Sequence, residues 1–150
     1  MPKDYGQRCP VAKTLEIVGD RWTLLMVRDL LAGTLRFQDL QASLPGIAPN
    51  ILSDRLKLME ERGLVTRRFY SDHPPRAEYE LTDKGKELGV VVGALADWGA
   101  RHVYKRARLV HAGSGREVRL GYFRADTGER VPGSSIRLSR GSSGTRRRRG

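Results

Sequence analysis

The segment that most constrains the fold is the amphipathic stretch from Ile47 to Gly63. Pro49 suits the first turn of a helix, because its missing N–H leaves no hydrogen bond unmade there. Apolar residues recur at steps of three and four, which places them on one helical face: Ala48, Leu52, Leu56 and Met59. The opposite face is polar, and Gly63 supplies the stop. The stretch therefore predicts a helix with one buried and one solvated side.

The neighbours of this helix place it in a larger motif. A shorter helical pattern, 35–44, precedes it across the turn at 45–46. Two strand patterns follow, 64–70 and 77–81, joined by the segment 71–76. The two prolines of that segment are expected to stay outside the ladder and to stiffen a protruding tip. Helix, turn, helix and hairpin is the plan of a winged helix-turn-helix, whose second helix enters the major groove of DNA.

Two further helical patterns precede this motif. A weak one extends from Val11 to Val18, and a stronger one from about Arg21 to Leu31, with Asp20 as a suitable N-cap. The stronger one has a wide apolar stripe, formed by Trp22, Leu25, Met26 and Leu30. We therefore expect it to be the central packing helix of the domain.

A long helix is expected after the hairpin, with Thr82 as its N-cap and a cationic end at 101–108. From 88 to 98 it is apolar almost all round, so it should be buried on more than one side. Because a domain this small covers only one side, the other is expected to pack on a second copy of the chain in a two-fold dimer. Burial within one monomer is the alternative. The predicted dimer interface consists of Val11, Leu15, Leu88, Val91, Val92, Leu95 and Trp98.

The net charge of +11 is unevenly placed along the chain. Residues 1–100 carry 14 Lys+Arg and 14 Asp+Glu, whereas residues 101–150 carry 14 against 3. The charge is therefore no evidence that the helix-turn-helix binds DNA, and that prediction rests on local pattern. Residues 139–150 have nothing to bury and are expected to form a disordered basic tail. Such a tail adds salt-sensitive, sequence-independent affinity for DNA, or is simply solvated.

Composition excludes several classes of protein. A single cysteine, Cys9, rules out an internal disulfide framework and a multi-cysteine zinc site, and favours a reducing cytoplasm. No apolar run is long enough to span a bilayer, and no signal peptide is recognisable. Catalytic motifs are lacking, and no histidine stands beside a carboxylate at metal or triad spacing: His73, His102 and His111. We expect a cytoplasmic protein that is not an enzyme and uses no cofactor, metal or membrane.

The order of motifs resembles a known family over roughly residues 9–100. The matching features include Cys9-Pro10-Val11, the run Gly19–Leu25, the helix ending in Glu61-Arg62-Gly63, the tip Pro74-Pro75-Arg76 and Leu81-Thr82. Together they resemble the HxlR-type transcriptional regulators. The resemblance implies a small homodimeric winged-helix protein that binds DNA, and many such proteins respond to aldehydes, quinones or oxidants.

Two details bear on that resemblance. Ala48 stands where the family often has a hydroxyl residue that caps the recognition helix, and the missing cap should weaken the helix start by about 1 kcal/mol. Cys9 lies where oxidant-sensing members often carry a cysteine, so the resemblance makes it a candidate redox sensor. Its alternative role is that of a small, partly buried residue. With one cysteine per chain, oxidation would give an intersubunit disulfide or a small-molecule adduct.

The predicted DNA contacts follow from this geometry. On the recognition helix, Asn50 can pair with adenine, Ser53 can bind either kind of base, and Lys57 can reach a base or a phosphate. Arg55 would serve a phosphate or a carboxylate inside the domain, and Asp54 must be neutralised locally or accept from cytosine. Strand alternation sends Arg67 and Arg68 to opposite faces, so at most one points at DNA. The full predicted set is Arg36, Pro49, Asn50, Ser53, Asp54, Arg55, Lys57, Arg67, Arg68, His73 and Arg76.

The predicted fold is mainly α with a small β-hairpin wing, an α+β winged helix-turn-helix that dimerises through its terminal helices. Residues 1–107 would form the DNA-binding and dimerisation domain, and 108–138 a small β-hairpin appendage, in which the short strands 117–123 and 130–131 flank the turn 126–129. The expected function is that of a homodimeric, sequence-specific regulator of transcription on double-stranded DNA, a repressor in preference to an activator, with a small reactive molecule as effector. The alternative is a non-catalytic module that binds RNA or a protein through the wing and the basic C-terminus.

Overall fold

The computed structural model describes residues 4–139. The chain divides into two compact units, with the boundary in the sequence between Leu109 and Val110. The predicted tail, 139–150, lies outside the described residues except for Ser139. No helix of the described part is long and apolar enough to cross a membrane.

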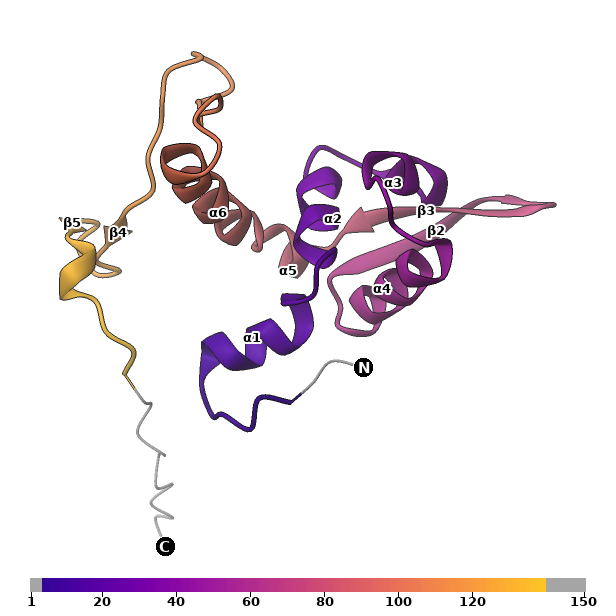
Figure 1. Ribbon diagram of the computed structural model, residues 1–150, viewed down its shortest axis with the longest axis horizontal. Helices are drawn as coiled ribbons and strands as arrows, with labels where there is room; N and C mark the ends of the chain where they lie inside the picture. The colour runs from indigo at the N-terminus through magenta and orange to yellow at the C-terminus, as the bar shows by residue number, and fades with distance from the viewer. Residues whose placement is uncertain (1–3, 140–150) are drawn as a thin grey trace, which may run out of the picture. The chain divides into compact units, whose positions relative to one another are not determined.

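The first unit is a set of helices around a small antiparallel sheet (Figure 1). Its elements, in chain order, are α1 (Pro10–Val18), α2 (Thr23–Leu30), β1 (Leu35–Arg36), α3 (Phe37–Ser43), α4 (Pro49–Glu61), β2 (Val65–Asp72), β3 (Pro75–Leu81), α5 (Asp83–Lys86) and α6 (Gly89–His102). The hairpin of β2 and β3 projects beyond α3 and α4 as a wing (Figure 1). The predicted fold class, mainly α with a small β wing, is confirmed.

Helix α4 forms as its sequence pattern predicts. Leu52, Leu56 and Met59 are buried in the core, and Pro49 occupies the first turn. The N–H of Leu64 donates to the carbonyl of Met59 at 2.8 Å, and Gly63 adopts a φ of 71°, which ends the helix as predicted. Ala48, expected on the apolar face, is instead the exposed N-cap. It precedes the helix, so the helical periodicity does not apply to its side chain.

Helix α2 departs from its prediction in two respects. It begins at Thr23 and not at Arg21, so Trp22 occupies the N-cap position. Its buried side consists of Thr23, Met26, Val27 and Leu30, whereas Leu25 is 37% exposed. Steps of three and four from Thr23 lead to Met26, Val27 and Leu30, and Leu25 lies about 100° away from that face. The inclusion of Leu25 in the buried stripe was wrong.

The sheet of the first unit has the strand order β1-β3-β2. Arg36 and Arg68 both lie opposite Glu78, and Leu35 and Arg67 both lie opposite Tyr79. Strand β1 was not predicted, because its two residues were assigned to the start of the following helix. Only its pairing with the distant strand β3 makes it a strand.

The wing is longer than predicted. Its register runs from the pair Val65–Leu81 to the pair Asp72–Pro75, with a β-bulge between Phe69 and Ser71. The expectation that both prolines stay outside the ladder was wrong for Pro75. Pro75 is the first residue of β3, a position where proline is tolerated in a sheet.

The long helix predicted after the wing is divided in two. Thr82 caps α5, and its Oγ1 accepts a hydrogen bond from Gly85 N at 3.0 Å. The N–H of Leu88 then donates to Gly85 O, three residues back, which closes a tighter turn before α6 begins. Helix α6 ends at His102, where the N–H of Tyr104 donates to Gly99 O at 2.7 Å. The predicted extension to residue 108 was therefore wrong, because this five-residue bond closes the helix.

The second unit contains two turns with the same hydrogen bonding. In the first, His111 N donates to Arg116 O and Gly115 N donates to His111 O, both at 2.8 Å. In the second, Arg124 N donates to Glu129 O and Gly128 N donates to Arg124 O, again at 2.8 Å. Both glycines have positive φ, 66° and 71°, which suits the tight return of the chain. The turns belong to the similar segments 110–118 (VHAGSGREV) and 123–131 (FRADTGERV).

Short strands complete this unit. Strands β4 (Tyr122–Phe123) and β5 (Arg130–Val131) pair across the second turn, as the turn signal at 126–129 predicted. The first predicted strand, 117–123, is shorter than expected, and Glu117 makes only an isolated bridge to Val110. Arg124 Nη2 lies 2.7 Å from Asp126 Oδ2, and this hydrogen bond lowers the pKa of Asp126.

Candidate nucleic-acid interface

The polar side of α4 faces solvent. Asn50, Ser53, Asp54 and Lys57 are all exposed, while the opposite side of the helix is buried. Asp54 makes no ion pair with any described residue. Of the two roles expected for Asp54, local neutralisation is therefore not observed among these residues. The N-cap of the helix, Ala48, has extended backbone (φ −72°, ψ 142°) and makes no side-chain cap hydrogen bond. The exposed side chains thus project from a helix whose opposite side is packed in the hydrophobic core.

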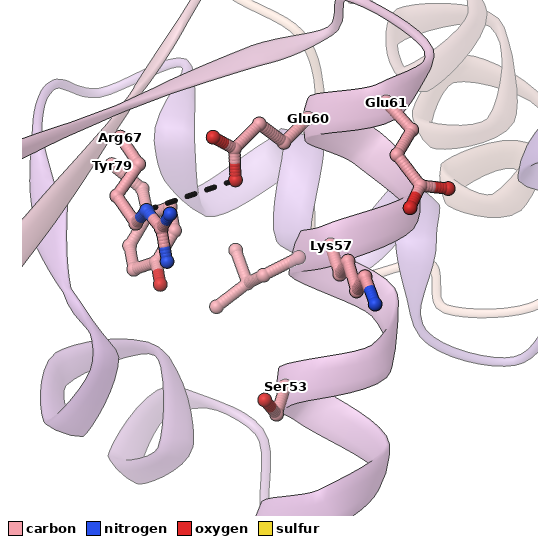
Figure 2. Close-up of a pocket in the computed structure, with 7 residues that line it drawn as sticks. Ser53, Lys57, Glu60, Glu61, Arg67 and Tyr79 are labelled. Atoms are coloured by element: carbon pink, nitrogen blue, oxygen red, sulfur yellow. Dashed lines mark ion pairs between the residues drawn. The ribbon is translucent and has the colours of Figure 1, made fainter.

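A groove of about 400 Å3 separates the C-terminal half of α4 from the sheet (Figure 2). We call it the recognition-helix groove, and its lining is Ser53, Leu56, Lys57, Glu60, Glu61, Arg67 and Tyr79. Figure 2 shows Glu60 pointing across it to Arg67, whose Nε lies 3.8 Å from Glu60 Oε2. Burial, together with the charge of Glu60, raises the pKa of Tyr79, whereas Arg67 lowers it. The groove carries both signs of charge.

The arginines of β2 occupy opposite faces of the wing, as predicted. Arg67 lies in the recognition-helix groove, with its Cζ 5.2 Å from the centre of the Phe69 ring. Arg68 donates to the carboxylate of Glu78, with Nε 3.0 Å from Oε1, and this hydrogen bond raises the pKa of Arg68. A DNA phosphate would have to compete with Glu78 for Arg68. Of the two, Arg67 is the better placed beside α4.

A second groove, of about 310 Å3, lies between the start of α3 and the wing. We call it the wing groove, and its lining is Arg36, Phe37, Gln38, Tyr70, Pro75, Arg76 and Ala77. The Cζ of Arg36 lies 4.7 Å from the centre of the Tyr70 ring. Two arginines that were predicted as DNA contacts, Arg36 and Arg76, are thus brought to one groove. His73 is exposed at the tip of the wing and does not line it.

Arg55 is turned toward its own domain. Its Nε lies 3.9 Å from Asp20 Oδ2, and the two side chains are 21% and 22% exposed. The same carboxylate accepts hydrogen bonds from the backbone N–H groups of Trp22 and Thr23, at 2.9 and 3.2 Å, and from the Thr23 hydroxyl. Of the two partners predicted for Arg55, the structure shows the internal carboxylate.

Several lining residues were not predicted: Gln38, Glu60, Tyr70 and Tyr79. Glu60 and Tyr79 could have been proposed from the alternation of β3 against the polar side of α4. Tyr70 could not, because the bulge after Phe69 changes the face on which the next side chain lies.

The predicted dimer residues fall into two groups. Leu88 and Val92 are half-buried against the core of their own chain. The others are exposed, with Leu95 and Trp98 of α6 at 56% and 57% and Val11 of α1 at 57%. Leu15 and Val91 are exposed at 42% and 38%. Helix α6 has no buried residue, so its apolar side chains lie on the surface of the first unit as far as the described residues show. Cys9, the N-cap of α1, is half-buried.

The family profile described as HxlR-like helix-turn-helix matches residues 17–107, which include both grooves and the whole of α4. The chain belongs to the HxlR-like helix-turn-helix family. It is accordingly a DNA-binding regulator of transcription, since its relatives are named HTH-type transcriptional regulators.

Two HxlR-like relatives illustrate the sequence likeness. The chain is 39% identical over 101 residues to the HTH-type transcriptional regulator YvaP of Bacillus subtilis, a stretch that covers 67% of this chain and 94% of YvaP. It is 42% identical over 93 residues to the regulator MT3179 of Mycobacterium tuberculosis, covering 62% of this chain and 58% of MT3179. The chain thus spans little more than half of the mycobacterial relative.

Comparison with solved structures supports the same family assignment. PA1607, named as a candidate transcription factor, superposes with a TM-score of 0.75 at 36% identity, covering 91% of this chain and 97% of PA1607. The redox regulator HypR in its reduced form superposes with a TM-score of 0.59 at 31% identity, covering 66% of this chain and all of HypR. The likeness to PA1607 is too extensive to stop at residue 109, so it reaches into the second unit.

Proposed function

We propose that this HxlR-like protein is a homodimeric repressor that binds specific sites on double-stranded DNA through α4. The observation that carries the proposal is the division of α4 into a buried apolar side and an exposed polar side with Asn50, Ser53 and Lys57. Asparagine can pair with adenine in the major groove, and serine can contact either kind of base. Pro49 fixes the helix start, and Asp54 is left to accept from cytosine.

The wing would contact the flanking backbone. Arg76 and Arg36 line the wing groove without acidic neighbours in its lining, and His73 is exposed at the tip. Arg67 supports α4 from the recognition-helix groove, although Glu60 partly satisfies its charge. Contacts to phosphate position a protein on the duplex, whereas contacts to base edges give sequence preference.

A second copy of the chain is the occupant that we propose for the apolar surface of α6. Leu95 and Trp98, together with Val11 and Leu15 of α1, are exposed in the single chain. Exposed apolar side chains that lie together mark protein interaction sites, and Leu95 and Trp98 are three residues apart on one face of α6. A two-fold pair would present α4 twice, which matches two half-sites on DNA.

Response to an oxidant is a second part of the proposal. It is supported by the likeness to HypR, which is named a redox regulator and has been solved in reduced and oxidised forms. Cys9 is the only thiol of this chain. Treating the protein with peroxide or a quinone, followed by intact-mass measurement and a non-reducing gel, should give a Cys9 adduct or a disulfide-linked pair with altered DNA affinity. If oxidised and reduced protein bind DNA equally, Cys9 has no sensing role.

Footprinting on the DNA upstream of its own and neighbouring genes tests the main proposal. We expect two protected half-sites about one helical turn, or a multiple of it, apart. Transcription in vitro from the protected promoter should fall as protein is added. The competing function, an RNA- or protein-binding module, predicts no footprint, and an RNA-binding module also predicts better competition by single strands than by duplex.

A further inference from the structure

We propose that the wing groove is a clamp for a single backbone phosphate of the bound duplex, held jointly by Arg36 and Arg76 and prepared by Tyr70. The proposal deepens the proposed DNA-binding function and rests on it. Neither Arg36 nor Arg76 forms an ion pair with any described residue, yet both line the same groove of about 310 Å3. Two like charges at one groove repel each other, and an anion between them removes that repulsion.

The lining of the two grooves separates their roles. Glu60 and Glu61 line the recognition-helix groove beside Lys57 and Arg67, so its cations have acidic neighbours. The wing groove has no carboxylate in its lining. Gln38 adds an amide that can donate, and Phe37, Pro75 and Ala77 supply apolar walls. Guanidinium groups donate to phosphate in a fixed fork, which suits this groove to an oxyanion and not to a cation.

Glu78 is the carboxylate that could have formed an ion pair with Arg36, and the structure shows why it does not. Arg36 and Arg68 both lie opposite Glu78 in the sheet, on the two sides of the central strand β3. Because residues directly opposite in a ladder share a face, both arginines can approach the same carboxylate. The hydrogen bonds go from Arg68. Arg68 thus satisfies Glu78 and leaves the Arg36 guanidinium available.

Tyr70 orients the Arg36 side chain for binding. The β-bulge between Phe69 and Ser71 takes Tyr70 out of the ladder, and bulges re-aim side chains in this way. Its ring lies 4.7 Å from the Arg36 Cζ. A guanidinium that stacks on a ring keeps its N–H edge free to donate. The backbone of Arg36 is fixed as well, since its N–H donates to Asp39 Oδ2 at 3.0 Å. Tyr70 is therefore a positioning residue.

Salt dependence tests whether the phosphate is shared. The full-length protein, Arg36→Ala, Arg76→Ala and the double variant are titrated on an operator duplex and on random duplex across a range of salt concentrations. Each phosphate neutralised contributes about 0.9 to the slope of log K against log salt. One shared phosphate predicts that the double variant loses about 0.9 per protomer in total, on both duplexes alike. A loss near twice that value, or none, overturns the clamp.

A cation outside the clamp provides the control. Lys86 follows the base of the hairpin, on α5, and does not line either groove. Lys86→Ala should leave the slope unchanged. If wild-type protein binds duplex with a footprint while the double variant keeps its slope, only the clamp fails. If wild-type protein shows no duplex preference, the proposed function itself fails.

Tyr70 is tested by two substitutions. Tyr70→Phe keeps the ring and should bind as wild type, whereas Tyr70→Leu should weaken binding roughly threefold, the order expected of an exposed cation–π contact. In the Arg36→Ala background, Tyr70→Leu should have no further effect, because its partner is gone. Persistence of the effect there, or equal loss with Tyr70→Phe, would show that Tyr70 contacts DNA itself and would overturn its positioning role. Urea unfolding of each variant verifies that the domain is intact.

Discussion

Asp20 Oδ2 lies 3.9 Å from Arg55 Nε, so an acid at the corner between α1 and α2 contacts the middle of the recognition helix. The same carboxylate holds the start of α2 through the N–H groups of Trp22 and Thr23. Thr23 is completely buried, and its hydroxyl has Asp20 as its acceptor. One side chain therefore links two helices that are far apart in sequence, α2 and α4.

The first prediction concerns this link. Asp20→Ala removes acceptors from a helix start and from a buried hydroxyl, so the free energy of unfolding should fall by about 1–3 kcal/mol in urea titrations. Arg55→Gln should weaken operator binding without lowering its salt slope, because Arg55 binds a carboxylate and not a phosphate. A slope lower by about 0.9 per protomer would instead make Arg55 a phosphate contact. The double variant gives the coupling energy.

The second prediction concerns the uncapped start of α4. Ala48 has the extended backbone of an N-cap and no side-chain acceptor. Ala48→Ser should raise the free energy of unfolding by about 1 kcal/mol, the usual value of such a cap. Ala42→Ser, inside α3, is the control and should give no gain, since serine is no better than alanine within a helix. Equal effects at both positions would show that serine acts in some other way.

The third prediction concerns base recognition. Asn50→Ala and Ser53→Ala should each weaken binding to the operator by about 1–3 kcal/mol while binding to random duplex stays the same. Lys57→Ala, if Lys57 reaches a phosphate, weakens both and lowers the salt slope. Fluorescence anisotropy with both duplexes distinguishes these outcomes. Uniform loss for Asn50→Ala would place that side chain on the backbone.

The fourth prediction concerns Glu78. Arg68→Ala leaves the Glu78 carboxylate without its partner, so it should turn to Arg36 and lower the affinity for DNA. Glu78→Gln in the same chain should restore the affinity, because the competing charge is then absent. The double variant therefore shows whether Arg68 acts by neutralising Glu78 or by contacting DNA. Failure of Glu78→Gln to restore binding would mean that Arg68 touches the DNA.

The fifth prediction concerns the apolar surface of α6. Leu95→Glu or Trp98→Glu should convert the protein to monomers in light scattering and abolish binding to paired half-sites, because a charge cannot be buried there without a partner. Leu138→Glu, at an exposed apolar residue of the second unit, is the matched control and should leave the mass unchanged. A dimer that survives both α6 variants requires a different interface.

The elements that could be predicted from the sequence are those whose signals are local. The periodicity of α4, the stop at Gly63 and the alternation of β3 depend on neighbours along the chain. The close approach of α5 to Leu64 depends on tertiary contact, since a Cβ at Gly85 would lie 2.1 Å from the carbonyl oxygen of Leu64. The sequence pattern of residues 82–102 gives no sign that Gly85 lies so close to Leu64.

The same distinction between local signals and tertiary contacts explains which parts of the candidate site could be predicted. The exposed face of α4 was predicted correctly, because burial of one helical side fixes the other. The partner of Arg55 was left open, because Asp20, 35 residues earlier in the chain, is brought to it only by the tertiary fold. The groove shared by Arg36 and Arg76 could not be predicted, because it requires β1 to pair with β3 and Tyr70 to leave the ladder at a bulge.

The twin turns at 111–116 and 124–129 have a consequence for folding. Each closes through backbone bonds between residues at most five apart, so neither needs the helices of the first unit to form. The similar segments 110–118 and 123–131 therefore each contain the residues that their own turn requires.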